Sequence, residues 1–249
     1  MQGRDVRVFY LIVDNKTSIL IERSLIKEGS FHMHKEIVVK NFIVFEGCEG
    51  SGKSTQVKLL VGRLEKVGRR VWPTKEPGGT PYGNKIRDLL LFEKPTGGID
   101  PLTEFLLFEA GRAEHMKVIQ DQLKRGGIVV CDRFSSSTFA YQGYARGLFP
   151  DHKEFMESID VHVRQGVRPG LIFLLDQDSV IGLKRKEDQK ARNRFEEENL
   201  TFHQKVREGF LELARTDISS KWKKIDASKN IEAIEKEIWE ITKKHLGIE

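Results

Sequence analysis

The stretch Gly47–Thr55, which reads G-C-E-G-S-G-K-S-T, constrains the fold more than any other part of the chain. It fits the pattern G-x-x-x-x-G-K-[S/T] and directly follows an apolar run at Phe42–Phe45. Glycines let the backbone curl, so that successive N–H groups point inward at phosphate oxygens. Apolar residues with the spacing of one helical face follow the loop, between residues 57 and 67. We therefore expect a strand, a phosphate-binding loop and a helix in succession, and this context disfavours the alternative of an ordinary glycine turn.

The loop predicts a site for a nucleoside triphosphate bound with magnesium. Lys53 would put a point charge on the outer phosphates, and the hydroxyl of Ser54 can be a ligand of Mg²⁺. Lys53 is therefore a candidate catalytic residue and Ser54 a candidate metal ligand. The candidate ATP-binding residues are Gly47, Cys48, Glu49, Gly50, Ser51, Gly52, Lys53, Ser54 and Thr55.

The composition restricts the classes of protein to which the chain can belong. Of its 249 residues, 39% are apolar and 32% charged, which is typical of a soluble globular protein with a real core. The formal charge of +5 comes from bases interleaved with acids, which indicates a mixed surface, and we expect no nucleic-acid partner. Two cysteines make no disulfide framework, so a reducing cytoplasm is expected. No apolar stretch approaches about 18 residues, so we expect no membrane contact.

Residues 1–36 fit no motif. The apolar run Val8–Val13 faintly resembles a secretory signal, but it is short, Asp14 ends it, and no cleavage site of small residues follows. The alternatives are a poorly packed N-terminal extension or an upstream start chosen in place of Met33. We expect residues 1–36 to be an extension and residues 37–249 to form a single domain.

Apolar runs alternate with helical patterns along the rest of the chain. Strands are expected at Ile37–Phe45, Arg70–Trp72 (ending at Pro73), Ile128–Cys131, Leu171–Leu175 and Lys224–Asp226. Helices are expected at Ser54–Val67, from Pro101 to Gly126, around Val180–Lys186 and over residues 231–241. Strands that alternate with helices predict a parallel sheet covered on both faces.

Ligands of open parallel sheets collect beyond the carboxyl ends of the strands. Asp132 follows four apolar residues at such an end, as expected of an acid that holds a water of hydrated Mg²⁺. The alternatives for Asp132 are a helix N-cap or a salt bridge to Arg133. Asp176 also ends a strand, and we interpret it as the cap of the helix around Val180–Lys186.

Arginines are the other groups that phosphoryl transfer needs, because they neutralise charge on the transferred group. Arg87, Arg112 and Arg133 lie in or next to the segments named. The stretch Lys184–Arg194 carries six basic residues and no large apolar one. It predicts either a solvated helix face or a lid over phosphates, at about residues 184–196.

Several motifs together resemble the thymidylate kinase family, in order from about residue 37 to residue 247. The phosphate loop is shared by many enzymes, whereas E-P-G-G-T and A-Y-Q-G at these spacings are much more specific. The segments that carry the resemblance are Phe42–Thr55, Glu76–Thr80, Lys85–Leu91, Leu107–Arg112, Asp132–Phe134 and Ser137–Gly143.

The resemblance implies a P-loop kinase fold: an α/β fold with a parallel five-stranded sheet flanked by helices and a basic lid. It also implies transfer of the γ-phosphoryl group of ATP to dTMP with Mg²⁺, by a homodimer. The implied dTMP-binding residues are Glu76 and Pro77 at the nucleoside, Arg87 and Arg112 at the phosphate, Phe108 stacked on thymine, Thr138 and Gln142 at the polar edge of the base, and Tyr141 at the sugar 2′ position. Arg133 would lie between the two nucleotides, and plain core packing remains the alternative for Phe108 and Tyr141.

The chain departs from the family pattern at two places. Phe134 stands where the family often has Tyr or His. Some members carry an arginine inside the phosphate loop, whereas others keep glycine there and put the basic catalytic group in the lid; Glu49-Gly50 resembles the second kind. The lid candidates are Arg185, Lys190, Arg192 and Arg194, and Gln189 stands where a basic residue is expected. We take Arg192 and Arg194 as catalytic, together with Lys53 and Arg133.

Two other functions remain open from the sequence. One is a related kinase that acts on another nucleotide or on a deoxynucleoside. The other is a non-catalytic P-loop protein that binds a nucleotide to regulate a partner. The combination of Lys53, Asp132, Arg133 and a basic lid disfavours the second.

Overall fold

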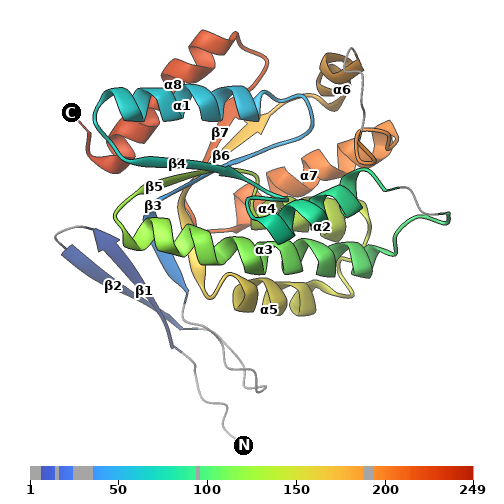
Figure 1. Cartoon of the computed structure of the whole chain (residues 1–249), viewed down its shortest axis with the longest axis horizontal. Helices are drawn as coiled ribbons and strands as arrows, with labels where there is room; N and C mark the ends of the chain where they lie inside the picture. Colours follow the sequence, from blue (N-terminus) through green and yellow to red (C-terminus); the bar gives the residue numbers. More distant parts are fainter. Residues whose placement is uncertain (1–6, 15–16, 25–35, 94–95, 188–192, 249) are drawn as a thin grey trace, which may run out of the picture.

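Five parallel strands form the central sheet of the protein, whose computed structural model describes residues 7–14, 17–24, 36–93, 96–187 and 193–248. The strands are β3 (Ile37–Glu46), β4 (Val71–Lys75), β5 (Ile128–Asp132), β6 (Val167–Asp176) and β7 (Trp222–Asp226). Their order across the sheet is β4-β5-β3-β6-β7, and every neighbouring pair is parallel (Figure 1). The predicted P-loop kinase fold, with a parallel five-stranded sheet, is confirmed.

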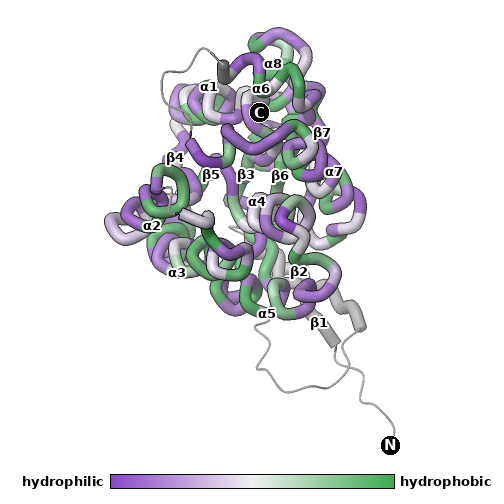
Figure 2. The backbone as a smooth tube through the Cα atoms, turned by 90° about the vertical axis from the view of Figure 1, so that its right-hand side faces the viewer, coloured by the Kyte–Doolittle hydropathy of each residue, from purple (hydrophilic) through white to green (hydrophobic). Residues whose placement is uncertain are grey.

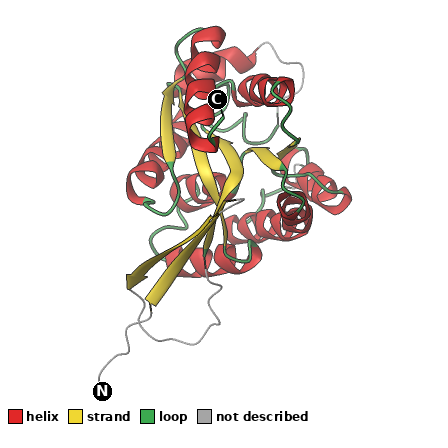
Figure 3. Ribbon diagram, turned by 90° about the vertical axis from the view of Figure 1, so that its left-hand side faces the viewer, coloured by secondary structure: helices red, strands yellow, loops and turns green. Residues whose placement is uncertain are grey.

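Helices cover both faces of this sheet (Figure 3). They are α1 (Lys53–Lys66), α2 (Pro81–Leu91), α3 (Pro101–Lys124), α4 (Ser135–Thr138), the π-helical turn η1 (Phe139–Ala145), α5 (Lys153–Val163), α6 (Ser179–Glu187), α7 (Leu200–Thr216) and α8 (Ile231–Leu246). Most of the helices carry both hydrophobic and hydrophilic residues along their length, as expected of helices with one buried face (Figure 2).

Alternate residues of β3 face opposite sides of the sheet and determine which helices pack on each side. Ile43 and Phe45 are buried against apolar side chains of α1 and α8. Phe42 and Val44 are buried on the other face, where Met116 of α3 contributes to the core. Since β3 lies in the middle of the sheet and is covered on both faces, its apolar run is continuous rather than alternating.

Two of the predicted boundaries were wrong in detail. Pro73 lies inside β4 and does not end it, because β4 is an edge strand, where a missing backbone N–H is tolerated. Asp176 does not cap α6. Its carboxylate accepts a hydrogen bond from Arg207 at 2.7 Å, whereas Asp178 accepts one from the backbone N–H of Val180 at 2.9 Å.

A two-stranded antiparallel sheet precedes the central sheet. It consists of β1 (Arg7–Asp14) and β2 (Thr17–Ser24), and β1 lies against β3. The sequence predictions named no regular structure here, although the runs V-F-Y-L-I-V and I-L-I are rich in strand-forming residues. Met33, the alternative start, lies outside the described residues.

Candidate active site

The phosphate loop joins the end of β3 to the start of α1, and its lysine is folded back onto the loop. Lys53 Nζ donates to the carbonyl oxygens of Gly47 at 3.0 Å and Cys48 at 2.7 Å. Its side chain is buried, and this loss of water, with the nearby charge of Arg133, lowers its pKa from 10.5 to about 8. The loop oxygens therefore hold the ammonium group inside the loop, where anionic phosphate would be a stronger partner.

The loop has no space for an arginine at the position of Gly50. Gly50 has a φ of +70°, and a Cβ atom there would lie 2.0 Å from the carbonyl oxygen of Gly182 in α6. In turn, a Cβ atom on Gly182 would lie 2.3 Å from the carbonyl oxygen of Glu49. The loop and α6 thus touch through backbone atoms, so a basic group for the phosphates in addition to Lys53 cannot come from position 50 of the loop.

The two predicted metal ligands lie in contact. Ser54 Oγ, in the first turn of α1, donates to Asp132 Oδ2, at the end of β5, at 2.5 Å. A hydroxyl and a carboxylate oxygen are ligands that Mg²⁺ accepts, and Mg²⁺ usually completes its shell with phosphate oxygens and water. Across the described ranges no three His, Cys, Asp or Glu side chains gather into a metal-binding group. These two residues fit a nucleotide-bound Mg²⁺ rather than an ion enclosed by protein alone.

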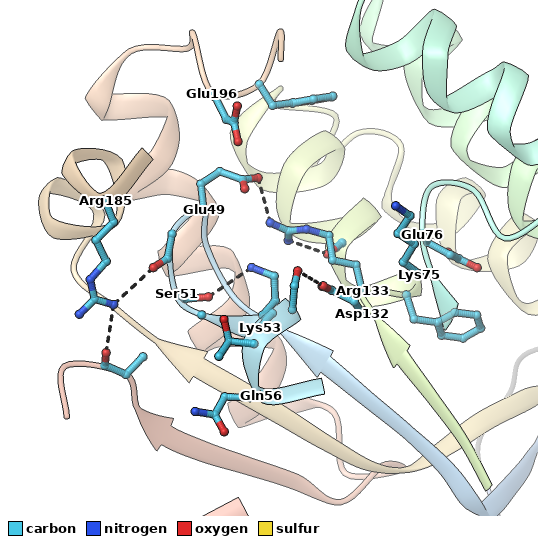
Figure 4. Close-up of a pocket in the computed structure, with 18 of the residues that line it drawn as sticks. Glu49, Ser51, Lys53, Gln56, Lys75, Glu76, Asp132, Arg133, Arg185 and Glu196 are labelled. Atoms are coloured by element: carbon cyan, nitrogen blue, oxygen red, sulfur yellow. Dashed lines mark hydrogen bonds and ion pairs between the residues drawn. The ribbon is translucent and has the colours of Figure 1, made fainter. Parts of the chain in front are cut away.

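Arg133 lies directly after Asp132 and contacts both sides of the site. Its backbone has a φ of +69°, which is uncommon for a residue other than glycine. Its guanidinium donates to Gly47 O at 2.9 Å and Ser137 Oγ at 3.1 Å. It also donates to Glu49 Oε1 at 2.8 Å (Figure 4). A further bond joins it to the hydroxyl of Tyr141 at 3.1 Å. Arg133 thus bridges the phosphate loop and the helical segment that follows β5.

A buried carboxylate that the sequence analysis missed fixes the turn at Arg133. Glu46, the last residue of β3, accepts from the backbone N–H groups of Phe134 at 3.0 Å and Ser137 at 3.2 Å, and from Ser137 Oγ at 2.6 Å. Burial raises the pKa of Glu46 from 4.5 to about 7, although these donors favour its ionised form. The signal in the sequence was an acid at the end of an otherwise apolar strand.

On the other side of Arg133, Arg112 of α3 lies in a buried network of acids. Its Nε donates to Glu76 Oε2 at 2.9 Å and its Nη2 to Thr138 Oγ1 at 2.8 Å, while Nη1 contacts Glu109. Glu76 Oε1 is also 2.9 Å from Nδ1 of His115. Arg112 is therefore in direct contact with two other predicted dTMP-binding residues, Glu76 and Thr138.

Arg87 and Phe108 come to the same region from α2 and α3. Arg87 Nη1 donates to the carbonyl oxygen of Pro77 at 2.9 Å, and burial lowers its pKa. Phe108 is partly buried, and its ring centroid lies 6.0 Å from that of Phe195. Both side chains line the cleft described below, so the packing and ligand-binding interpretations of Phe108 are compatible.

Tyr141 and Gln142 are also buried at the cleft. The ring of Tyr141 packs edge-on against Phe195 at 5.6 Å and Phe202 at 6.1 Å, and its hydroxyl donates to Glu49 at 2.8 Å. Gln142 is fully buried and its Nε2 donates to Glu104 at 2.7 Å. Phe195 and Glu104 were not predicted as site residues.

The lid arginines lie in different places. Arg185 of α6 reaches the phosphate loop, where its Nη1 is 3.4 Å from Gly50 O and 3.4 Å from Ala227 O (Figure 4). Arg194, which follows the lid, contacts α3 instead: its Nη2 is 2.5 Å from Glu104 Oε2. Arg192 and Lys190, with Gln189, lie outside the described residues.

A single cleft of about 1000 Å³ contains both groups of residues. The phosphate loop, Asp132 and Arg185 line it at one end, and Arg87, Phe108 and Gln142 line it at the other, with Arg133 and Tyr141 between them. Its geometry therefore offers two adjoining sites, one built for a polyphosphate and one walled by aromatic rings and arginines.

The comparisons with known proteins identify the family to which such a cleft belongs. The family model described as thymidylate kinase matches residues 45–238. The chain belongs to the thymidylate kinase family. It is similar to the thymidylate kinase of Chlamydia caviae, with 49% identity over 182 residues that cover 72% of this chain and 86% of that protein. It is also similar to the thymidylate kinases of Deinococcus radiodurans, with 42% identity over 80% of this chain and 94% of that protein, and of Syntrophotalea carbinolica, with 43% identity over 83% and 97%.

The family resemblance seen in the sequence is thus confirmed. The residues that the sequence analysis missed are buried next to the site and hold its residues in place through hydrogen bonds. Glu46, Glu104 and His115 are each buried and each bonded to a predicted site residue or to the segment that carries one. No local motif marks them, because each contacts a residue at least 38 positions away in the chain.

Proposed function

We propose that this protein transfers the γ-phosphoryl group of ATP to dTMP, giving dTDP and ADP. The observation that carries the proposal is the continuity of the cleft. The phosphate loop and the cradle of Arg87, Arg112 and Phe108 line one cavity, and Arg133 lies between them. A donor and an acceptor nucleotide bound in it would bring two phosphate chains end to end, as transfer in line requires.

The chemistry that fits the site is positioning with charge stabilisation and no covalent intermediate. An oxygen of the dTMP phosphate forms a bond to the γ-phosphorus of ATP, and the bond from that phosphorus to the bridging oxygen of ADP breaks. Arg87 and Arg112 would hold the acceptor phosphate. Lys53, Arg133 and a lid arginine would stabilise the charge that spreads over the transferred group.

Magnesium fits the oxygen pair of Ser54 and Asp132, whose contact at 2.5 Å brings a hydroxyl and a carboxylate to one point beside the loop. A bound Mg²⁺ supplies positive charge to the β- and γ-phosphate oxygens. Ser54 would be a direct ligand, and Asp132 would hold the ion partly through water. Removal of divalent cations with a chelator should abolish the transfer, and added Mg²⁺ should restore it.

The test is a coupled assay of ADP release with dTMP, dUMP, dCMP and thymidine as acceptors. We expect dTMP to be the best acceptor and thymidine to be inert, because two arginines are available for an acceptor phosphate. Faster turnover of dCMP or thymidine would favour the related nucleotide or deoxynucleoside kinase. ATP binding without ADP release for any acceptor would favour the non-catalytic regulator.

We further propose a cytoplasmic homodimer. The support is a set of exposed apolar side chains on α2, at its C-terminal end and on α3, which a second copy could cover: Tyr82, Leu89, Phe92 and Leu106. Among the described residues no helix has the length and apolar character needed to cross a membrane. The mass in solution from light scattering tests the dimer, and a monomer at assay concentrations would contradict it.

A further inference from the structure

Glu104 of α3 is a fully buried acid that phosphoryl transfer does not use. Its Oε1 accepts from Gln142 Nε2 at 2.7 Å and from Arg146 Nε at 3.2 Å. Its Oε2 accepts from Arg194 Nη2 at 2.5 Å. Three separate segments, α3, η1 and the stretch after the lid, therefore meet at this one carboxylate.

The partners of Glu104 determine how the amide of Gln142 is turned. A guanidinium has only donors, so the two arginines use Glu104 purely as an acceptor. An ionised carboxylate has no hydrogen to donate, so only the NH₂ group of Gln142 can face it. The hydrogen-bonding partners therefore determine which end of this amide is the oxygen and which is the nitrogen.

The oxygen of the same amide is left for a ligand. Gln142 lines the cleft, and its Oε1 is buried without a hydrogen-bond partner among the described residues. Buried polar atoms without partners are rare in folded proteins and are often completed by a bound molecule. Because the NH₂ group faces Glu104, Gln142 offers a hydrogen-bond acceptor, its Oε1, to a ligand in the cleft.

We propose that Glu104 is a positioning residue that sets the choice of acceptor base, by holding the Gln142 amide with its oxygen toward the cleft. The inference rests on the proposed function and adds to it the residue that controls base choice. Thymine and uracil carry a ring N–H donor, which an amide oxygen accepts. Cytosine carries a ring nitrogen with a lone pair at the same position. Two acceptors would then face each other, so cytosine and the oxygen of Gln142 would repel and form no hydrogen bond.

The test replaces Glu104 by glutamine and measures kcat/KM for dTMP, dUMP and dCMP. In Glu104→Gln the new amide can donate to Gln142 Oε1, so that Gln142 can turn its NH₂ group toward the cleft. We expect the preference for dTMP over dCMP to narrow by about 10- to 100-fold, the usual range for a mismatched hydrogen-bonding pair. The ratio of dTMP to dUMP should stay within about threefold, because both bases carry the ring N–H.

Arg146→Gln is the matched control. It removes one partner of Glu104 but leaves the carboxylate that holds Gln142, so the dTMP to dCMP preference should be kept. If Glu104→Gln fails to fold, the double variant Glu104→Gln with Arg194→Gln should show the same narrowing. It removes the guanidinium that loses its ion pair, whereas Arg146 keeps an ion pair with Glu198 at 2.6 Å. Circular dichroism and thermal unfolding check each variant.

A purely structural role for Glu104 predicts a different result: kcat/KM would fall by the same factor for all three acceptors. An unchanged dTMP to dCMP preference in the folded variants would overturn the inference while leaving the proposed function intact. If the wild-type protein does not phosphorylate dTMP at all, the proposed function itself fails, and the inference fails with it.

Discussion

Ser54 and Asp132 are 78 residues apart in the chain, yet Ser54 Oγ donates to Asp132 Oδ2 at 2.5 Å. They meet because β3 and β5 are parallel neighbours, so that the phosphate loop after β3 lies beside the carboxyl end of β5. We expect Asp132→Asn to raise the Mg²⁺ concentration for half-maximal rate by about tenfold. Ser54→Ala should have an effect of the same kind. In a double-mutant cycle the two losses should be less than additive, and full additivity would show that they do not act on one ion.

Lys53→Met should lower kcat by a factor of about 10² to 10³, because it removes a charge that stabilises the transferred phosphoryl group. The fold should persist, since burial already disfavours the charged lysine and lowers its pKa to about 8. The measurements are steady-state kinetics and thermal unfolding. Lys66→Met, at the far end of α1, is the control, and a Lys53 variant that keeps normal turnover would remove this residue from the mechanism.

Arg185→Ala should lower kcat by a factor of about 10² and leave KM for dTMP roughly constant, because Arg185 reaches the phosphate loop rather than the acceptor cradle. Lys184→Ala, one position earlier and exposed, is the matched control. Arg194→Ala should act instead through Glu104, by lowering the melting temperature. If Arg185→Ala keeps full kcat while kcat falls in Arg194→Ala, then Arg194 and not Arg185 supplies the catalytic charge.

Glu46→Gln should change how stability depends on pH. The pKa of Glu46 is raised from 4.5 to about 7, so its protonated form favours the folded state. This contribution is fully present below about pH 4.5 and is lost as the pH rises through about 7. The unfolding free energy of the wild type should therefore fall relative to Glu46→Gln between pH 5 and pH 8, by about 2 kcal/mol. Urea unfolding at the two pH values checks this, and parallel pH profiles would contradict it.

Deletion of residues 1–32, so that the chain begins at Met33, should leave kcat/KM for dTMP within about twofold and the melting temperature within about 3 °C. The reason is that β1 and β2 form a sheet of their own and add no strand to the central one. A large fall in melting temperature would show that the contact between β1 and β3 stabilises the domain.

The sequence was sufficient where the signal is local. The phosphate loop, the strand ends at Asp132 and Asp176, and the helices α1, α3, α6 and α8 could be predicted, because each depends on residues adjacent in the chain. The other helical segments, α2, α4, η1, α5 and α7, were not predicted. The same locality explains the errors. A proline looks like the end of a strand unless the strand is known to lie at an edge, and β4 is such a strand.

By itself, the sequence determined the family, the parallel sheet and the residue types that gather at the cleft. Only the tertiary structure decided their partners: Glu46 under the turn at Arg133, Gln142 against Glu104, and Arg185 rather than Arg194 beside the phosphate loop. The physical reason is that motifs record local backbone geometry, whereas the partner of a buried charge depends on which strands become neighbours. The order β4-β5-β3-β6-β7 brings these distant residues together, and that order is not a property of any single segment.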